Sequence, residues 1–131
     1  MRAIAQYRSN RIESASKPQI VLMLFQEALR RMEFAVQAMN DNKPSVWRAH
    51  LHHVREIFLE LRHALDDTAA PELCATLRSL YQWCNDELIA AGRESQPTRI
   101  GPVIRVTTLL TEGWQGALES LGREGQAAPA P

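Results

Sequence analysis

The sequence lacks the features that direct a chain into or across a membrane. No apolar stretch approaches the about 20 residues that a membrane-spanning helix requires. The N-terminus has no basic segment followed by an apolar run and small residues, which is the pattern of a secretory signal. We therefore expect a protein without a membrane span that works in the cytoplasm.

A cysteine framework and a charge of one sign are also missing. Cys74 and Cys84 lie ten residues apart in what reads as one helix, and the rise of about 15 Å between them is too long for a disulfide. Free thiols and the lack of a Cys-x-x-Cys pair are typical of a reducing cytoplasm. The 15 basic and 15 acidic residues cancel, which argues against nucleic-acid binding because such modules rely on a concentrated positive field.

Motifs of common catalytic sites are absent as well. The sequence has no Gly-x-Ser-x-Gly and no Gly-x-x-x-x-Gly-Lys motif. Its histidines are His50, His52, His53 and His63, and only Glu60 with His63 has the Glu-x-x-His spacing that a di-iron bundle needs twice. The Lys and Gly that typically follow a phosphorelay histidine are missing. We predict no catalytic residue, no metal and no cofactor, with a histidine phosphotransfer bundle as the alternative.

Helical periodicity dominates what the sequence does contain. Prolines at nearly equal intervals each precede a segment with apolar residues at helical spacing, and proline favours the first turn of a helix. Ser16 and Gln19 have the spacing of a capping box, so the first helix should start at Lys17. The predicted helices cover residues 17–40, 45–66, 71–91 and 99–121.

These helices predict an all-α fold, because no stretch shows the sustained apolar and polar alternation of a strand. Short loops favour antiparallel neighbours, so we expect an antiparallel four-helix bundle over residues 16–121. Residues 1–15 would form an N-terminal arm. Residues 122–131 have the composition of a disordered tail.

More apolar residues occur on these helices than the predicted inward stripes use. Those left outside are Ile20, Met23, Leu24, Leu59, Val106 and Leu109. Several on one small bundle suggest grooves, which either the arm, through Ile4, Tyr7 and Ile12, or a partner's amphipathic helix could cover. Gly113 lacks a side chain inside the fourth helix, which either allows close approach of a docked backbone or marks a frayed helix end.

Several short motifs, taken in order, resemble the FliS family of flagellar secretion chaperones. They are Gln6-Tyr7-Arg8-Ser9-Asn10, Glu13-Ser14-Ala15-Ser16, Leu22-Met23-Leu24-Phe25, Leu80-Tyr81 and Leu109-Leu110-Thr111-Glu112-Gly113-Trp114. The resemblance covers about residues 4–120. It implies a cytoplasmic helical bundle that binds the C-terminal segment of flagellin in hydrophobic grooves, so that flagellin cannot join a filament before type III secretion.

The resemblance also implies site residues and further partners. By position, Tyr7 and Asn10 would contact the partner with Ile12 beside them, unless the arm only caps the bundle. Family members are linked to the flagellar export gate and, in some lineages, to an anti-sigma factor. The basic, His-rich second helix and Gly101-Pro102 depart from the commoner pattern. A helical adaptor for another secretion substrate is therefore a further alternative.

Overall fold

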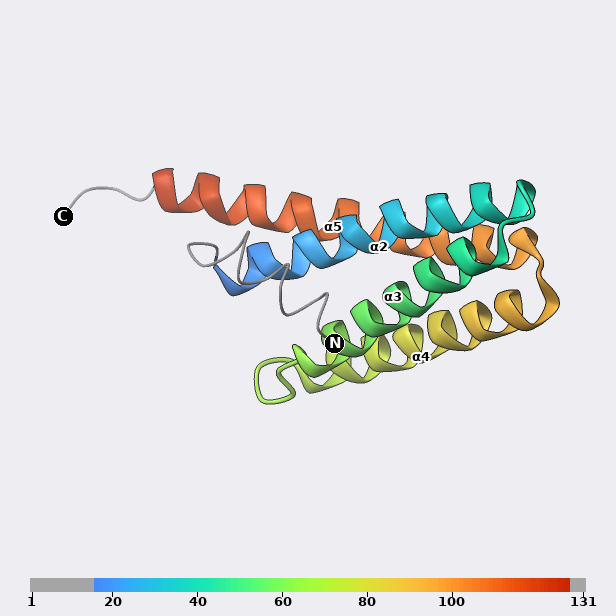
Figure 1. Ribbon diagram of the computed structural model, residues 1–131. Coiled ribbons are helices and arrows are strands. Elements are labelled where there is room, and N and C mark those ends of the chain that lie inside the picture. The colour runs from blue at the N-terminus through green and yellow to red at the C-terminus, as the bar shows by residue number, and fades with distance from the viewer. Residues whose placement is uncertain (1–15, 128–131) are drawn as a thin grey trace.

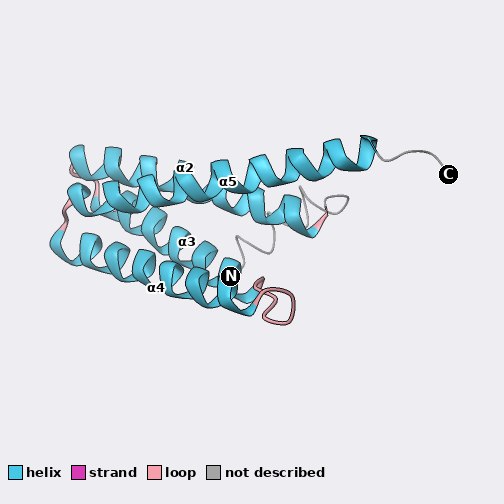
Figure 2. Cartoon of the chain, turned by 180° about the vertical axis from the view of Figure 1, so that it is seen from behind, coloured by secondary structure: helices cyan, strands magenta, loops and turns pink. Residues whose placement is uncertain are grey.

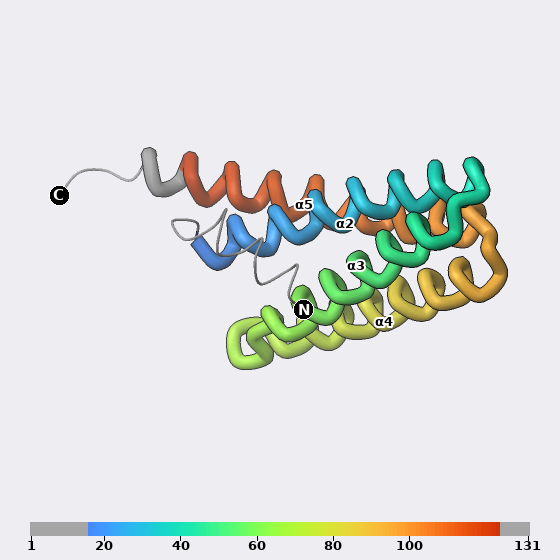
Figure 3. The backbone as a smooth tube through the Cα atoms, in the orientation of Figure 1, coloured from blue at the N-terminus to red at the C-terminus, as the bar shows by residue number. Residues whose placement is uncertain are grey.

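The computed structural model describes residues 16–127 and contains α-helices joined by short loops (Figure 1). The helices are α2 (Lys17–Asn40), α3 (Pro44–His63), α4 (Pro71–Glu94) and α5 (Ile100–Ala127), and a short 3-10 helix, η1 (Pro97–Arg99), precedes α5. Successive helices run in opposite directions, as the continuous tube in Figure 3 shows. The predicted all-α antiparallel four-helix bundle is therefore confirmed for the described part of the chain.

The two ends of the bundle are different. Viewed from behind, the α2–α3 and α4–α5 connections lie at one end, and the α3–α4 loop lies at the other (Figure 2). Helix α2 packs against both α3 and α5, and α4 packs against the same two helices. Helices α3 and α5 therefore occupy diagonal corners. No helix within residues 16–127 is long and apolar enough to cross a membrane.

Helix α2 starts where the sequence predicts because Ser16 caps it. The Gln19 backbone N–H donates to Ser16 Oγ at 3.4 Å, and the Ser16 N–H donates to Gln19 Oε1 at 3.0 Å. This reciprocal pair satisfies two amides that the first helical turn leaves without partners. At the other end Asn42 adopts a left-handed conformation, φ 55°, and the chain turns into α3.

The core is filled by side chains from all four helices. The largest fully buried side chains include Phe25, Met32, Ile57, Leu61, Leu88 and Val103. The Tyr81 ring of α4 lies 6.5 Å from the Phe25 ring of α2 and 5.9 Å from the Phe58 ring of α3, measured between centroids. Each such aromatic pair contributes about 0.5–1.5 kcal/mol beyond area burial. The aromatic cluster thus joins three helices.

Two helix ends differ from the prediction. Helix α3 stops at His63, three residues early, because Asp66 Oδ1 accepts a hydrogen bond from the Thr68 N–H at 3.0 Å and holds the chain in a turn. Helix α4 continues three residues past its predicted end at residue 91, through Gly92 to Glu94. Its left-handed cap is Ser95, φ 53°, whose N–H donates to the Ala91 carbonyl.

Helix α5 is longer than predicted. It begins at Ile100, with Pro102 in the first turn where its missing N–H is tolerated. It continues to Ala127, so residues 122–127 of the expected tail are helical, and only residues 128–131 lie outside the described part. Arg, Glu, Gln and Ala in this stretch are good helix formers, which outweighs two glycines. The extension projects beyond the other helices (Figures 1 and 2).

Candidate functional site

The predicted partner-binding residues of the arm are Ile4, Tyr7, Asn10 and Ile12, and they lie outside the described residues. Their roles, including the choice between a binding arm and a cap, stay predictions. The described candidates lie on α2, α3 and α5.

Leu24 does not belong to the outer surface. Its side chain is only 2% exposed and packs in the core, so its assignment to a partner-binding face was wrong. The predicted inward stripe through Val21, Phe25 and Ala28 would be sufficient for a helix that packs against only one other helix. Helix α2 packs against both α3 and α5, so it buries a wider arc that includes Leu24 and Glu27.

Ile20 and Met23 remain partly exposed at the start of α2. Ile20 also packs on the core and lines a cavity of about 200 Å³ between α2 and the end of α3. The same cavity is lined by Lys17, Val21, Leu24, Glu60, His63 and Ala64. This part of the predicted surface is therefore a shallow recess with both charged and apolar walls.

The remaining predicted residues lie on α3 and α5. Leu59 of α3 is 44% exposed and Leu109 of α5 is 68% exposed, as expected for surface positions. Val106 is half-buried against the core. A Cβ added to Gly113 would meet no described atom within 4 Å, so the surrounding chain makes no close approach there. Because α3 and α5 are diagonal, the structure distributes the predicted site over several surfaces.

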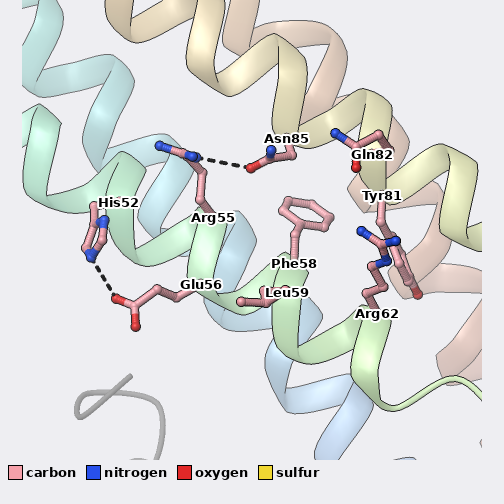
Figure 4. A pocket seen from close by; sticks show the side chains of 9 residues that line it. All are labelled: His52, Arg55, Glu56, Phe58, Leu59, Arg62, Tyr81, Gln82 and Asn85. Atoms are coloured by element: carbon pink, nitrogen blue, oxygen red, sulfur yellow. Dashed lines mark hydrogen bonds and ion pairs between the residues drawn. The ribbon is translucent and has the colours of Figure 1, made fainter.

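A cavity of about 340 Å³ lies between α3 and α4 (Figure 4). Phe58 and Tyr81 contribute buried aromatic rings to its lining, with Leu59 beside them. Its other lining residues are polar or charged: His52, Arg55, Glu56, Arg62, Gln82 and Asn85. The result is a depression with apolar side chains beneath a polar edge.

Hydrogen bonds hold part of that edge in place. Arg55 Nε donates to Asn85 Oδ1 at 3.1 Å, which joins α3 to α4 across the cavity. His52 Nε2 lies 3.1 Å from Glu56 Oε1 one turn along α3 (Figure 4). Burial raises the pKa of Tyr81 to about 12, so its phenol stays protonated at neutral pH.

This cavity was not predicted, although Arg48, Arg55 and Arg62 fall off the inward stripe of the helix predicted over residues 45–66. Their regular seven-residue spacing is the one signal in the sequence that they share an edge of α3. Periodicity could not show that this edge faces α4, because that depends on how two helices pack.

A charged cluster joins α2 to α3 on the side of α3 that faces α2. Glu27 accepts hydrogen bonds from Arg30 at 2.6 Å and Arg31 at 2.8 Å, and Arg31 Nη1 lies 3.4 Å from His50 Nδ1. Burial alone would raise the pKa of Glu27, but the two arginines outweigh it and lower that pKa. Burial and then the charge of Arg31 lower the pKa of both His50 and His53.

None of these groups forms an obvious reactive centre. Among the described side chains, those of residues 16–123, no three His, Cys, Asp or Glu are placed to hold a metal ion. Cys74 and Cys84 are free, as predicted, and both are buried. Burial raises the pKa of the Cys84 thiol to about 12, which disfavours the nucleophilic thiolate.

A family model, the flagellar protein FliS, matches residues 1–121 of this sequence. The chain belongs to the FliS family. The flagellar secretion chaperone FliS of Bacillus subtilis (strain 168) is similar to it, with 23% identity over 114 residues that cover 87% of this chain and 84% of the relative.

A solved structure agrees in fold. A bacterial flagellar chaperone superposes with a TM-score of 0.76 at 22% identity, covering 92% of this chain and 98% of that one. FliS proteins are chaperones and not enzymes, which confirms the prediction of no catalytic activity and removes the phosphotransfer alternative.

Proposed function

We propose that this protein is a cytoplasmic export chaperone that binds the C-terminal segment of flagellin and prevents its polymerisation before flagellar type III secretion. Membership of the FliS family supports the chaperone role. The bound segment would lie as amphipathic helices against exposed apolar side chains. On the described helices, the proposed contact residues are Ile20, Met23, Leu59, Val106, Leu109 and Gly113. Leu24 is no longer among them because it is buried.

The observation that carries the proposal is the exposure of large apolar side chains on a bundle of the FliS family. Leu109 is 68% exposed, Phe34 is 49% exposed and Leu59 is 44% exposed. Single exposed apolar residues are normal, but several on a small protein provide area that a helical ligand can bury. A flagellin segment that orders on binding would gain its affinity from this burial.

Isothermal titration with a peptide that spans the C-terminal helical segment of a flagellin tests the proposal. We expect binding at micromolar concentration or below. Leu109→Asp should weaken it by about tenfold or more, because a charge would replace a buried apolar contact. Leu121→Asp is the matched control, since Leu121 is 62% exposed on the same helix and outside the proposed contacts.

Two results would contradict the proposal. An absence of binding at micromolar peptide concentration would remove flagellin as the partner and favour another secretion substrate. Equal losses with Leu109→Asp and Leu121→Asp would show that position 109 has no specific role. Circular dichroism of each variant establishes that the bundle is intact.

A further inference from the structure

The groove between α3 and α4 continues beyond the cavity of Figure 4. A second cavity of about 240 Å³ shares His52 and Arg55 with the first and extends towards the start of α3. A third, about 330 Å³, shares Arg62 and Gln82 with the first and extends towards the start of α4. Because neighbouring cavities share lining residues, the three follow one another along the two helices, and we refer to them together as the α3–α4 groove. This length corresponds to several turns of a bound helix.

Arginines line this groove at regular intervals. Arg48, Arg55 and Arg62 follow each other every seven residues, so they lie along one edge of α3 over about 21 Å. Arg78 and Arg93 line the same groove from α4. Glu56 is the one carboxylate among the residues that line the three cavities. Because the whole chain has no net charge, this excess of positive charge is local.

Most of this positive charge is not neutralised by neighbouring carboxylates. Arg78 pairs with Asp67 at 3.0 Å, and Arg55 donates to the neutral amide of Asn85. Among the side chains that the structure describes, residues 16–123, no carboxylate lies within ion-pair distance of Arg48, Arg62 or Arg93. The Arg48 guanidinium instead lies 5.0 Å from the centroid of the Trp47 ring. The groove therefore presents guanidinium groups that can accept a negative partner.

Apolar side chains lie between these arginines. Leu59 on α3 is 44% exposed and Ile89 on α4 is 38% exposed. Phe58, Tyr81 and Leu88 also line the groove and are themselves almost fully buried. An apolar centre with a positive border matches an amphipathic helix whose apolar stripe is flanked by acidic residues.

We propose that the α3–α4 groove binds such an acidic amphipathic helix from a partner protein. The first 15 residues of the chain have the wrong sign for this groove, since they contain three Arg and one Glu. A nucleic acid would match the arginines but not the exposed leucine and isoleucine. This inference goes beyond flagellin binding, because its determinant is the arginine border. Leu59 is the one residue that the groove shares with the proposed flagellin contacts.

The test uses the full chain and two synthetic helical peptides of about 18 residues, which match the length of the groove. Both peptides carry Leu at alternating three- and four-residue spacing, and the flanking positions are Glu in one and Gln in the other. Isothermal titration should show the Glu peptide binding at least about tenfold more tightly. The difference should shrink as NaCl is raised, because salt screens exposed charges.

Variants locate the binding. The double variant Arg48→Gln/Arg62→Gln should lose the preference for the Glu peptide. The matched control Arg105→Gln/Arg123→Gln removes the same charge from exposed positions on α5. This control should retain the preference for the Glu peptide. Leu59→Asp should weaken both peptides, because a carboxylate would enter the apolar centre of the groove. Circular dichroism confirms that each variant folds.

Several outcomes would overturn the proposal. Equal affinities for the Glu and Gln peptides, or no binding of either, would show that the arginines do not select acidic helices. If the Arg105→Gln/Arg123→Gln control also lost the preference for the Glu peptide, that preference would depend on the net charge of the protein and not on the groove. A single-stranded oligonucleotide that binds the groove and displaces the Glu peptide would assign it to nucleic acid. None of these results depends on whether the flagellin peptide binds.

Discussion

At the scale of single residues, Leu24 and Glu27 show how a helix with two neighbours buries more than one stripe. Both side chains are almost inaccessible, although one is apolar and the other charged. Leu24 gains from leaving water, whereas Glu27 is tolerated because Arg30 and Arg31 supply hydrogen bonds to its carboxylate. The two positions therefore respond to mutation for different reasons.

Leu24→Ala should destabilise the bundle by about 2–5 kcal/mol, since it removes a buried side chain and leaves a cavity. Urea unfolding followed by circular dichroism measures the change. Met23→Ala is the control, because Met23 is the adjacent residue and is partly exposed. This substitution should lower the free energy of unfolding clearly less than Leu24→Ala. Similar losses for the two variants would show that Leu24 is no more buried in solution than Met23.

Glu27 should make stability depend on pH. Its folded-state pKa lies below the ordinary value of 4.5, so the carboxylate stabilises the fold above that value, and the contribution is lost as pH falls through the folded-state pKa. Glu27→Gln should therefore be less stable than the natural protein at pH 7, and the difference should narrow below about pH 4.5. Urea unfolding across this range measures it. A constant difference between the two proteins would contradict a lowered pKa.

At the scale of the element, α5 combines a polar buried face with a specific tie to α2. Thr107 and Thr111 are buried, and their hydroxyls donate to the carbonyls of Val103 and Thr107 at 2.7 Å. Trp114 Nε1–H donates to the Pro18 carbonyl at 2.8 Å. Such internal hydrogen bonds allow hydroxyls in a core, and the indole bond fixes where α5 lies along α2.

Trp114→Phe should lower the free energy of unfolding by about 1 kcal/mol, because the Pro18 carbonyl loses its donor while most of the apolar contact remains. Urea unfolding measures the change. Trp83→Phe is the matched control, since Trp83 is 38% exposed and no described partner bonds to its indole. Equal effects of the two substitutions would show that the hydrogen bond to Pro18 adds nothing to stability.

Helix starts were easier to predict than helix ends. Ser16 specifies its own boundary through local hydrogen bonds, which the residue types and their spacing reveal directly. The end of α3 depends on a turn at Asp66, and the end of α4 depends on Ser95 adopting an uncommon conformation without glycine. Helical spacing also predicts that Leu73 and Leu121 point inward, but both are exposed. Leu73 lies in the first turn of α4, and Leu121 lies two turns beyond Trp114, which already contacts the beginning of α2. Periodicity alone does not report where a neighbouring helix stops.

At the scale of the whole molecule, the sequence predicted the bundle but only fragments of its surfaces. Helical spacing identifies the side chains that each helix buries, which is sufficient for an antiparallel bundle. It does not specify which outer faces become neighbours. Ile20, Leu59 and Leu109 were therefore grouped, although they lie on three helices, and the arginine-lined groove between α3 and α4 was missed.

Thiol chemistry should report on the intact bundle. Cys74 and Cys84 are 5% and 0% exposed, and the Cys74 Sγ–H donates to the Asp66 carbonyl at 3.2 Å. Neither should react with Ellman's reagent at neutral pH until urea unfolds the protein, after which both should react. The absorbance of the thiolate that the reagent releases measures how many cysteines have reacted. Rapid reaction of Cys84 without denaturant would show that the core opens locally.

The position of Trp114 also gives the protein a built-in optical probe. Trp47 is buried, Trp83 is exposed, and Trp114 is half-buried where α5 meets the beginning of α2. Replacing the first two by Phe would leave one indole whose emission wavelength depends on its contact with water and with the Pro18 carbonyl. A ligand that separates α5 from the start of α2 would then shift this emission to the red. Binding at that junction could be followed in real time without any attached label.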